Sequence, residues 1–271
     1  MNPHMFDPSN HCFVVPAYGE SPHLAECLHS LGTQSTKSRA LITTSTPNRH
    51  IADLAQRHGI QVHVNPQRDG GIGADWNFAL AQARSCWVTL AHQDDVYLPG
   101  FTDKVFRALS RNPDAVLAFS GYDEIEENML RPASTLLLIK KILLELGFLG
   151  RSRASSRFSK TNALRFGCAI PCPAVTVKSD GFRFSTELKV DLDWAAWLEL
   201  ARSPGAFVYI RQSLMQHRVH SESETSSAIS TGVRLAEDEA LLRSLWPAFI
   251  ARAILASYRI AYRSNQAPSE T

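Results

Sequence analysis

The sequence predicts an α/β fold with a mostly parallel central sheet and helices on both of its faces. The first observation is that short apolar runs alternate with amphipathic runs five times between residues 12 and 119. The second is that glycines end the helical patterns, as Gly32 and Gly59 do after the first two. Parallel strands need crossover connections of this length, so helices should cover the sheet on both sides.

Composition limits the classes of function. The chain has 271 residues, 44% of them hydrophobic and 20% charged, which is enough to build one large core. A formal net charge of +2 excludes a dedicated nucleic-acid binder, so no nucleic-acid partner is expected. Five cysteines without zinc-ligand spacing indicate buried thiols in a reducing compartment. No signal peptide or bilayer-spanning run is recognised, so we expect a cytoplasmic protein.

Residues 12–120 carry the clearest element signals. Ser21-Pro22 and Thr46-Pro47 are N-cap residues followed by proline at the first helical position. Apolar residues then recur at i, i+3 and i+4, so each helix should bury one face. The Gly70–Gly73 loop precedes the third helix. The expected strands are 12–15, 40–44, 60–64, 87–91 and 115–119, and the expected helices are 22–31, 47–58, 76–83 and 101–109.

After residue 121 the alternation stops. The run 136–146 is a very apolar helix, for which core burial, a membrane surface and a partner protein remain open, core burial being the most frequent case. Acidic residues 123–127 should be solvated, and the basic, serine-rich run 151–160 should be mobile. The remaining expectations are a helix from Asp191 to Ala201, a strand 207–210, a loop 217–225, two helices between 234 and 263 that separate near Trp246-Pro247, and a polar tail.

Two groups of carboxylates draw attention. Asp94 and Asp95 directly follow the strand 87–91, at the sheet edge where α/β proteins bind ligands. Neighbouring carboxylates are costly to bury without a positive partner, so either a divalent metal meets them or they form a solvated turn. Asp191 and Asp193 open a helix, where they either favour the helix dipole or act chemically. Cys168 and Cys172 form the only close cysteine pair, which is weak support for zinc.

The order of the motifs resembles the family 2 glycosyltransferases with the GT-A fold, over residues 12–225. Five motifs of that family have a counterpart in this chain. They are the first-strand motif, the Gly-x-x-x-Arg-Asn-x-Gly segment, the Asp-x-Asp metal region, the Glu-Asp pair and the late Arg-x-His loop. These counterparts are Val14-Val15-Pro16-Ala17-Tyr18, Gly73–Leu80, His92-Gln93-Asp94-Asp95 with Pro99-Gly100, Leu192-Asp193, and His217-Arg218-Val219-His220 with Thr225.

The sequence also departs from the family pattern. Thr43-Thr44-Ser45-Thr46 stands where the family commonly carries Asp after the second strand. Asp75 stands near the usual Ala-Arg, His92 or Gln93 replaces the first Asp of the metal motif, and Leu192 replaces Glu. The chain would therefore be a divergent member.

The resemblance implies a metal-dependent, inverting transfer of sugar from a nucleoside-diphosphate sugar to an acceptor hydroxyl. The acceptor would be a glycan or a lipid-linked glycan, reached by peripheral contact at the inner face of the membrane. Residues 1–225 would form the GT-A domain, with a nucleotide-sugar half at 12–120 and an acceptor half at 121–225, and residues 226–271 would form C-terminal helices and a tail. A non-catalytic sugar-nucleotide or glycan-binding protein is the alternative. Nucleotidyl transfer is disfavoured, because no Lys or Arg follows the first strand in residues 16–20.

The resemblance also assigns roles to individual residues. Asp193 would be the catalytic base, and Asp95 with His220 would bind Mn²⁺ or Mg²⁺. For Asp75 the alternative role is capping of a helix N-terminus. The expected donor-binding residues are Pro16, Ala17, Tyr18, Asp75, Asn77, Asp94 and Arg218.

Overall fold

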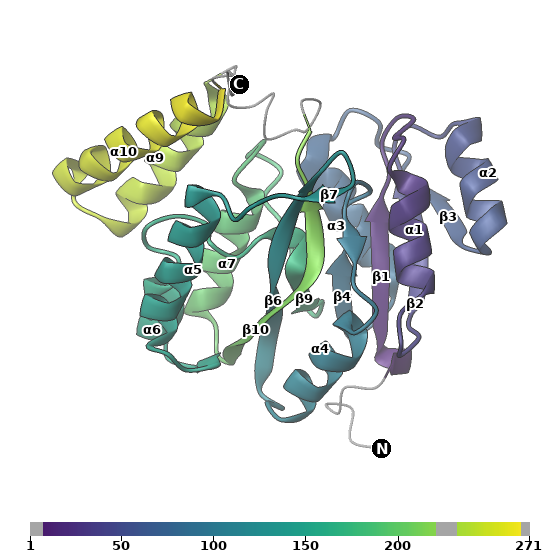
Figure 1. The fold of residues 1–271 in the computed structure, drawn as a ribbon, viewed down its shortest axis with the longest axis horizontal. Coiled ribbons are helices and arrows are strands. Elements are labelled where there is room, and N and C mark those ends of the chain that lie inside the picture. Colours follow the sequence, from purple (N-terminus) through teal and green to yellow (C-terminus); the bar gives the residue numbers. More distant parts are fainter. Residues whose placement is uncertain (1–7, 221–231, 267–271) are drawn as a thin grey trace.

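A central sheet runs through the middle of the molecule, and α5, α6, α9 and α10 lie beyond it at one end (Figure 1). The computed structural model describes residues 8–220 and 232–266. The main strand order is β3-β2-β1-β4-β9-β6-β10-β5, with β7 beside β6 and β8 beside β10. Strands β3, β2, β1 and β4 are parallel, and β10 is parallel to β6. Because β9 is antiparallel to both β4 and β6, β6 and β10 run in the same direction as the first four strands.

The strands expected from the sequence are all present. The short strands β5, β7 and β8 pair antiparallel with β10 or β6 and were not expected. The strands are β1 His11–Pro16, β2 Arg39–Thr44, β3 Gln61–Val64, β4 Trp87–Leu90, β5 Val96–Tyr97, β6 Ala115–Glu126, β7 Met129–Leu130, β8 Arg153–Ala154, β9 Val175–Lys178 and β10 Ala206–Arg218.

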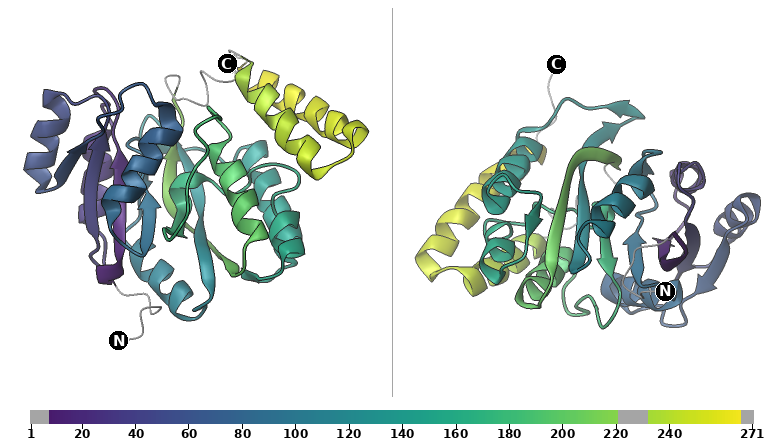
Figure 2. Two further views of the ribbon diagram at one scale, coloured as in Figure 1. Left: turned by 180° about the vertical axis from the view of Figure 1, so that it is seen from behind. Right: turned by 90° about the horizontal axis from the view of Figure 1, so that it is seen from below.

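Helices cover both faces of the sheet (Figure 2). Alternate residues of β1 enter two different core clusters: Cys12 and Val14 one, Phe13 and Val15 the other. The buried residues of α3 and α7 join the first cluster, and those of α1, α2 and α4 join the second. The helices are η1 Pro8–Asn10, α1 Leu24–Gly32, α2 Arg49–His58, α3 Gly71–Ala83, α4 Phe101–Ser110, α5 Thr135–Phe148, α6 Arg157–Asn162, η2 Cys172–Ala174, α7 Leu192–Arg202, α9 Val233–Leu245 and α10 Ala248–Gln266.

Two strands are longer than expected. β6 continues to Glu126 and β10 to Arg218, and the two remain paired to Arg218 across two irregularities between Ile210 and Met215. The expectation of a loop at His217-Arg218 is therefore wrong, because β10 extends to Arg218. The acidic run 123–127 lies mostly in β6, and its acidic side chains are half-buried or exposed, which agrees with the expectation of a solvated run. Backbone pairing between the strands satisfies the polar backbone groups there, whatever the side chains are.

The run 151–160 is ordered, so the expectation of mobility is wrong. It contains β8 and the start of α6, and Lys160 is buried. The Lys160 ammonium donates to the carbonyl oxygens of Leu200, Ser203 (2.5 Å) and Gly205 (2.9 Å). Lysine therefore satisfies carbonyl groups at and just beyond the C-terminal end of α7, a favourable place for a cation.

Helix α5 is only half buried, so the expectation of core burial holds for one face alone. Ser134 caps its first turn by accepting from the Leu137 backbone N–H. The buried residues are Leu137, Leu144, Gly147 and Phe148, and the exposed ones are Leu138, Ile139, Ile142 and Leu146.

The two C-terminal helices are present as expected and separate at Trp246-Pro247. Leu242 of α9, with Ala251 and Leu255 of α10, belongs to the first core cluster. No helix in the described ranges is both long and apolar enough to cross a membrane.

The start of α3 lies directly against the segment that leads into α7. A Cβ atom on Gly73 would lie 2.1 Å from the carbonyl oxygen of Ser185 and 3.0 Å from a methyl group of Leu192. Only glycine permits this approach. Asn77 strengthens it, because its side chain bonds to both the backbone N–H (2.8 Å) and the carbonyl (2.9 Å) of Phe184.

Candidate active site

The end of β4 carries the central group of the site. Asp95 is fully buried, and its Oδ1 accepts from His217 Nδ1 and from the Arg218 backbone N–H, both at 2.9 Å. Its other oxygen, Oδ2, is buried and has no hydrogen-bond partner among the described residues. Burial alone would lower the pKa of His217, but the Asp95 carboxylate outweighs it, so the pKa of His217 is raised.

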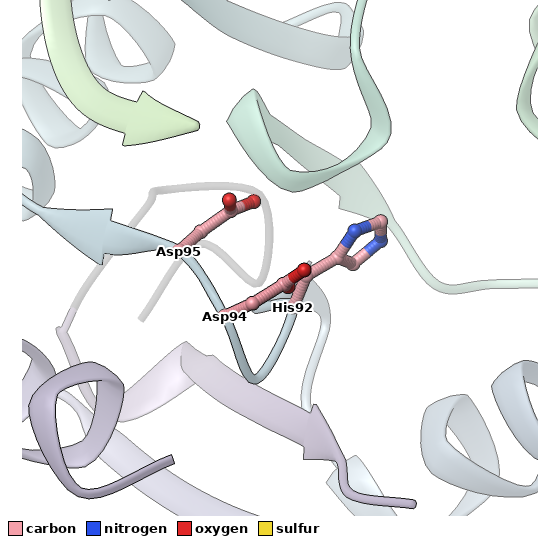
Figure 3. Close-up of side chains that lie close together, drawn as sticks. All are labelled: His92, Asp94 and Asp95. Atoms are coloured by element: carbon pink, nitrogen blue, oxygen red, sulfur yellow. The ribbon is translucent and has the colours of Figure 1, made fainter. Parts of the chain in front are cut away.

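His92 and Asp94 complete a cluster with Asp95 (Figure 3). Each residue offers one ligand atom, and these atoms lie within 4.8 Å of one another. His92 Nε2 is also buried without a hydrogen-bond partner in the described part of the chain. Unpartnered buried acceptors beside two carboxylates fit a divalent cation. His92 was noted from the sequence only as a replacement for Asp, so its ligand position is new.

His220 contacts this cluster from the end of the described chain before residue 221. Its Nε2 lies 3.0 Å from Asp94 Oδ2. Burial would raise the pKa of Asp94, but the charges of His92 and His217 and the bond from His220 hold it below its ordinary value. The predicted ligand His220 is therefore not one of the three clustered residues, but it contacts one of them, Asp94. Thr225, which belongs to the same predicted loop, lies outside the described residues.

Arg218 is buried and fully hydrogen-bonded within the protein. Its Nε donates to the backbone carbonyl of Asp94 at 2.9 Å. The other two guanidinium nitrogens donate to Asn128 Oδ1 and Glu26 Oε2, both at 2.5 Å. The guanidinium therefore lies beside the cluster of His92, Asp94 and Asp95, and its predicted role in donor binding remains a prediction. Glu26 is a partner that no sequence pattern indicated.

The end of β1 lies against the same loop. The Ala17 N–H donates to the carbonyl of Thr43 at 2.7 Å, which continues the pairing of β1 with β2 past Pro16. The Gln93 amide accepts from the Tyr18 N–H (3.0 Å) and donates to the Tyr18 carbonyl (3.2 Å). The Tyr18 ring is 62% exposed, which leaves it free to contact a ligand. Gln93 is thus a positioning residue that the sequence did not identify.

The Asp75 side chain bonds to the residues that directly follow β2 and β3. Its Oδ2 accepts from Ser45 Oγ and its Oδ1 from Asn65 Nδ2, each at 2.8 Å. The capping alternative is wrong, because Asp75 lies inside α3, which begins at Gly71. A carboxylate on α3 therefore stands next to Ser45, in the segment where the resembling family carries its own Asp.

Asp193 lies in the first turn of α7 and is partly buried. Its Oδ1 accepts from the Trp194 N–H at 2.7 Å, and its Oδ2 lies 3.5 Å from Cys168 Sγ. Burial raises the pKa of Asp193, and the charges of Arg234 and Lys140 only partly offset that effect. Such a carboxylate is more basic than an exposed one.

Asp191 occupies the N-cap position of α7, but its side chain makes no capping bond. Glu237 on α9 holds the segment just before the helix, accepting from the backbone N–H groups of Lys189 (2.8 Å), Val190 (2.9 Å) and Asp191 (3.0 Å). Asp191 is 1% exposed, and Arg234 lies 3.8 Å from its Oδ1. Burial, followed by the charge of Asp238, raises the pKa of Asp191 to about 8.

Two side chains, Cys172 and Lys140, interact electrostatically both with the groups at the end of β4 and with Asp193 at the start of α7. Burial raises the pKa of Cys172 well above its ordinary value, and the charges of Asp193 and Asp95 both add to the effect. The Lys140 charge acts on Asp193 and also on His217, the partner of Asp95. The β4 cluster and the start of α7 are therefore within electrostatic range of the same residues.

Comparisons with known proteins agree with this architecture. The family model described as Glycosyl transferase family 2 matches residues 12–172. An uncharacterized glycosyltransferase of Rickettsia typhi is 22% identical over 240 residues, covering 88% of this chain and 70% of the relative. S. aureus TarS 1–349 in complex with UDP-GlcNAc superposes with a TM-score of 0.65 at 12% identity, covering 96% of this chain and 74% of that one. Mannosyltransferase PcManGT from Pyrobaculum calidifontis, in complex with GDP-Man and Mn²⁺, gives 0.61 at 13%, covering 92% and 71%.

These structural likenesses establish the GT-A fold, with its mixed but mostly parallel sheet. The fold and its relatives define the class of protein as a glycosyltransferase. More than half of the chain matches the family model, and the chain belongs to glycosyl transferase family 2.

Proposed function

We propose that the protein is a metal-dependent, inverting glycosyltransferase that moves a sugar from a nucleoside diphosphate to an acceptor hydroxyl. The observation that carries the proposal is the buried Oδ2 of Asp95, which lacks a partner in the described chain and lies in a cluster with His92 and Asp94. A cation offsets the cost of burying this oxygen. The imidazole favours Mn²⁺ over Mg²⁺, which prefers oxygen ligands.

The cation would be held by Asp95 and Asp94, with His92 or His220 as a nitrogen ligand. Its chemistry would be to offset the negative charge that develops on the leaving diphosphate. The positive charges of Arg218 and of a protonated His217 lie at the same edge and act in the same direction.

The donor would lie over the ends of β1, β2 and β4. Pro16, Ala17 and Tyr18 would contact the nucleotide, and Asp75 would present its carboxylate beside Ser45. Asn77 would support the sugar side of the pocket from α3. The UDP-GlcNAc and the GDP-Man with Mn²⁺ in the two similar structures support a nucleotide-sugar donor and a metal.

Asp193 would act as the general base. In a single displacement, the acceptor oxygen bonds to the anomeric carbon while the bond from that carbon to the phosphate oxygen breaks. Asp193 takes the proton of the acceptor hydroxyl, and its raised pKa makes it a better proton acceptor than an exposed aspartate. The attack comes from the face opposite the leaving group, so the anomeric configuration inverts.

The acceptor would be a glycan or a lipid-linked glycan, met at the inner face of the membrane by a cytoplasmic enzyme. We assign catalysis to residues 1–225, with donor contacts in residues 12–120 and acceptor contacts in residues 121–225. The boundary between residues 225 and 226 lies outside the described ranges.

The test begins with a thermal-shift screen of nucleotide sugars with and without Mn²⁺. The donor that stabilises the protein only with Mn²⁺ is then supplied with an acceptor glycan, and proton NMR gives the anomeric configuration of the product. We expect inversion. A retained configuration would refute the single displacement, and stabilisation that does not depend on Mn²⁺ would refute the metal site.

A further inference from the structure

Exposed large apolar side chains gather in one part of the chain. Nine of the twelve found in the described residues lie between residues 129 and 166. Five of these belong to α5 and the residue that follows it, and they are 46–69% exposed. We name these five the α5 stripe: Leu138, Ile139, Ile142, Leu146 and Leu149.

The stripe is a single face of the helix. Successive residues turn by about 100° around an α-helix, so positions 138, 139, 142 and 146 fall within an arc of about 100°. Leu149 directly follows the helix as its C-cap residue. The buried residues Leu137, Leu144 and Phe148 lie on the opposite side. Figure 1 places α5 at the end of the molecule away from α2 and β3. A continuous apolar face of this kind indicates an interaction surface.

The charge around the stripe is strongly positive. Residues 131–160 contain seven Lys and Arg but one acid, Glu145, a net charge of +6. The whole chain carries +2, so the rest carries −4. Glu145 is itself neutralised by Arg211, through two bonds of 2.6 and 2.8 Å. Of the seven cations, Arg151 and Arg157 are exposed and Lys141 is half-buried beside the stripe. Lys160 is buried and Arg153 pairs with Asp114, so these two do not add to the exposed charge.

We propose that the α5 stripe docks on the surface of an anionic lipid bilayer. An apolar helix face flanked by Lys and Arg matches the acyl and phosphate layers of such a surface. A second copy of this chain fits less well, because both partners would bring the exposed cations Arg151 and Arg157 to the contact. The surface deepens the proposed function, since it would bring a lipid-linked acceptor to the enzyme.

The inner side of the same helix approaches the site. Lys140 Nζ lies 3.3 Å from the hydroxyl of Tyr122, and the Tyr122 ring lies 6.1 Å from the ring of His217. Helix α5 and the Tyr122 side chain of β6 therefore lie between the docking surface and His217, the partner of Asp95. An acceptor anchored in the bilayer would have a short way to the catalytic cluster.

Co-sedimentation of the intact protein with vesicles tests the proposal without turnover. We expect binding to phosphatidylglycerol vesicles, weaker binding to phosphatidylcholine vesicles, and release by high salt. The double variant Leu138→Asp/Ile142→Asp should lower the partition coefficient by at least about tenfold. Val64→Asp, an exposed apolar position on β3, is the matched control and should bind like the wild type.

Equal binding by the stripe variant and the control would overturn the proposal, as would wild-type protein that stays in the supernatant. So would a wild-type dimer that the double variant dissociates in analytical ultracentrifugation. Should the double variant fail to fold, hydrogen exchange on the wild type decides. Vesicles should then slow exchange in residues 135–149 and leave residues 49–58 unchanged, and the absence of that difference would refute docking. Because no sugar transfer is measured, failure here leaves the proposed reaction intact.

Discussion

Asp191 and Asp193 stand two positions apart at the start of α7, and their surroundings give them different uses. Two residues of α9 contact Asp191: Arg234 lies near its carboxylate, and Glu237 accepts from its backbone N–H. Its pKa of about 8 keeps it mostly protonated at neutral pH. Asp193 is only partly buried and lies within electrostatic range of residues that also act on the β4 cluster. Asp193 is therefore the carboxylate that an acceptor could reach.

At the residue scale we first predict the effect of removing the base. Asp193→Asn should lower kcat by about 10²–10⁴-fold, the usual contribution of general-base catalysis, with little change in the donor KM. Asp191→Asn is the matched control and should keep kcat near the wild-type value. Steady-state kinetics with radiolabelled donor measures both. An equal loss in the two variants would mean that the start of α7 matters only structurally.

The pH dependence of kcat gives a second prediction. A general base works only when deprotonated, so kcat should fall as the pH drops through the pKa of Asp193. Because burial raises that pKa, the acid limb should lie above pH 3.8, the ordinary value for aspartate. The pH–rate profile measures the limb, and the residual activity of Asp193→Asn should lack it. A limb that persists in that variant would assign the base to another group.

At the scale of elements, α9 holds the start of α7 in place. Glu237 accepts from three consecutive backbone N–H groups in the segment that leads into α7 and ends at its N-cap residue Asp191. The carboxylate also favours the positive end of the helix dipole. Glu237 thus positions the turn on which Asp193 is carried, from a helix more than forty residues further along the chain.

We predict that Glu237→Ala lowers the free energy of unfolding by about 1–3 kcal/mol, because three backbone donors lose their acceptor, among them the N–H of the buried Asp191. Glu239→Ala is the control on the same helix. Glu239 pairs with Arg243 one turn away, a contact worth about 0.3–0.5 kcal/mol. Urea unfolding at neutral pH compares the two variants. Similar losses in both would show that Glu237 has no special role.

Local pattern was enough to predict most elements and the buried faces of the helices. The residues at i, i+3 and i+4 in α1 and α2 are all buried, as expected from a repeat that each helix carries by itself. The lengths of β6 and β10 were not predictable in this way, because pairing between distant strands sets them. Whether α5 is buried or exposed was left open for a related reason: an apolar run does not reveal which side packs against the protein.

At the scale of the whole molecule, the site joins segments that the sequence keeps far apart. The types and positions of Asp95, Asp193 and Arg218 could be read from motifs. Their partners could not: His217 bonds to Asp95 across 122 positions, and Arg218 to Glu26 across 192. Such pairs arise only when the sheet has brought strand ends together. The predicted roles of the site residues remain predictions.

Global stability should depend on pH through Asp191. Its folded pKa of about 8 is raised above the ordinary 3.8, so the folded state favours the protonated form. The contribution is fully present below pH 3.8 and is lost as the pH rises through about 8. We predict that Asp191→Asn gains stability relative to the wild type across this range, on the order of a few kcal/mol at the alkaline end. Urea unfolding at several pH values measures the difference, and a difference that does not change with pH would contradict it.

The central claim is that the Asp95 carboxylate holds a cation beside the leaving diphosphate. Calorimetric titration of UDP and GDP, with Mn²⁺ and with a chelator, tests this claim most directly on wild type, Asp95→Asn and the exposed control Asp53→Asn. Asn retains the oxygen that accepts from His217 and the Arg218 N–H but removes the charge. We predict that Mn²⁺ strengthens binding of the nucleotide to the wild type and to the control, and that Asp95→Asn loses this gain by at least about tenfold. Unchanged Mn²⁺-dependent affinity in Asp95→Asn would contradict the account.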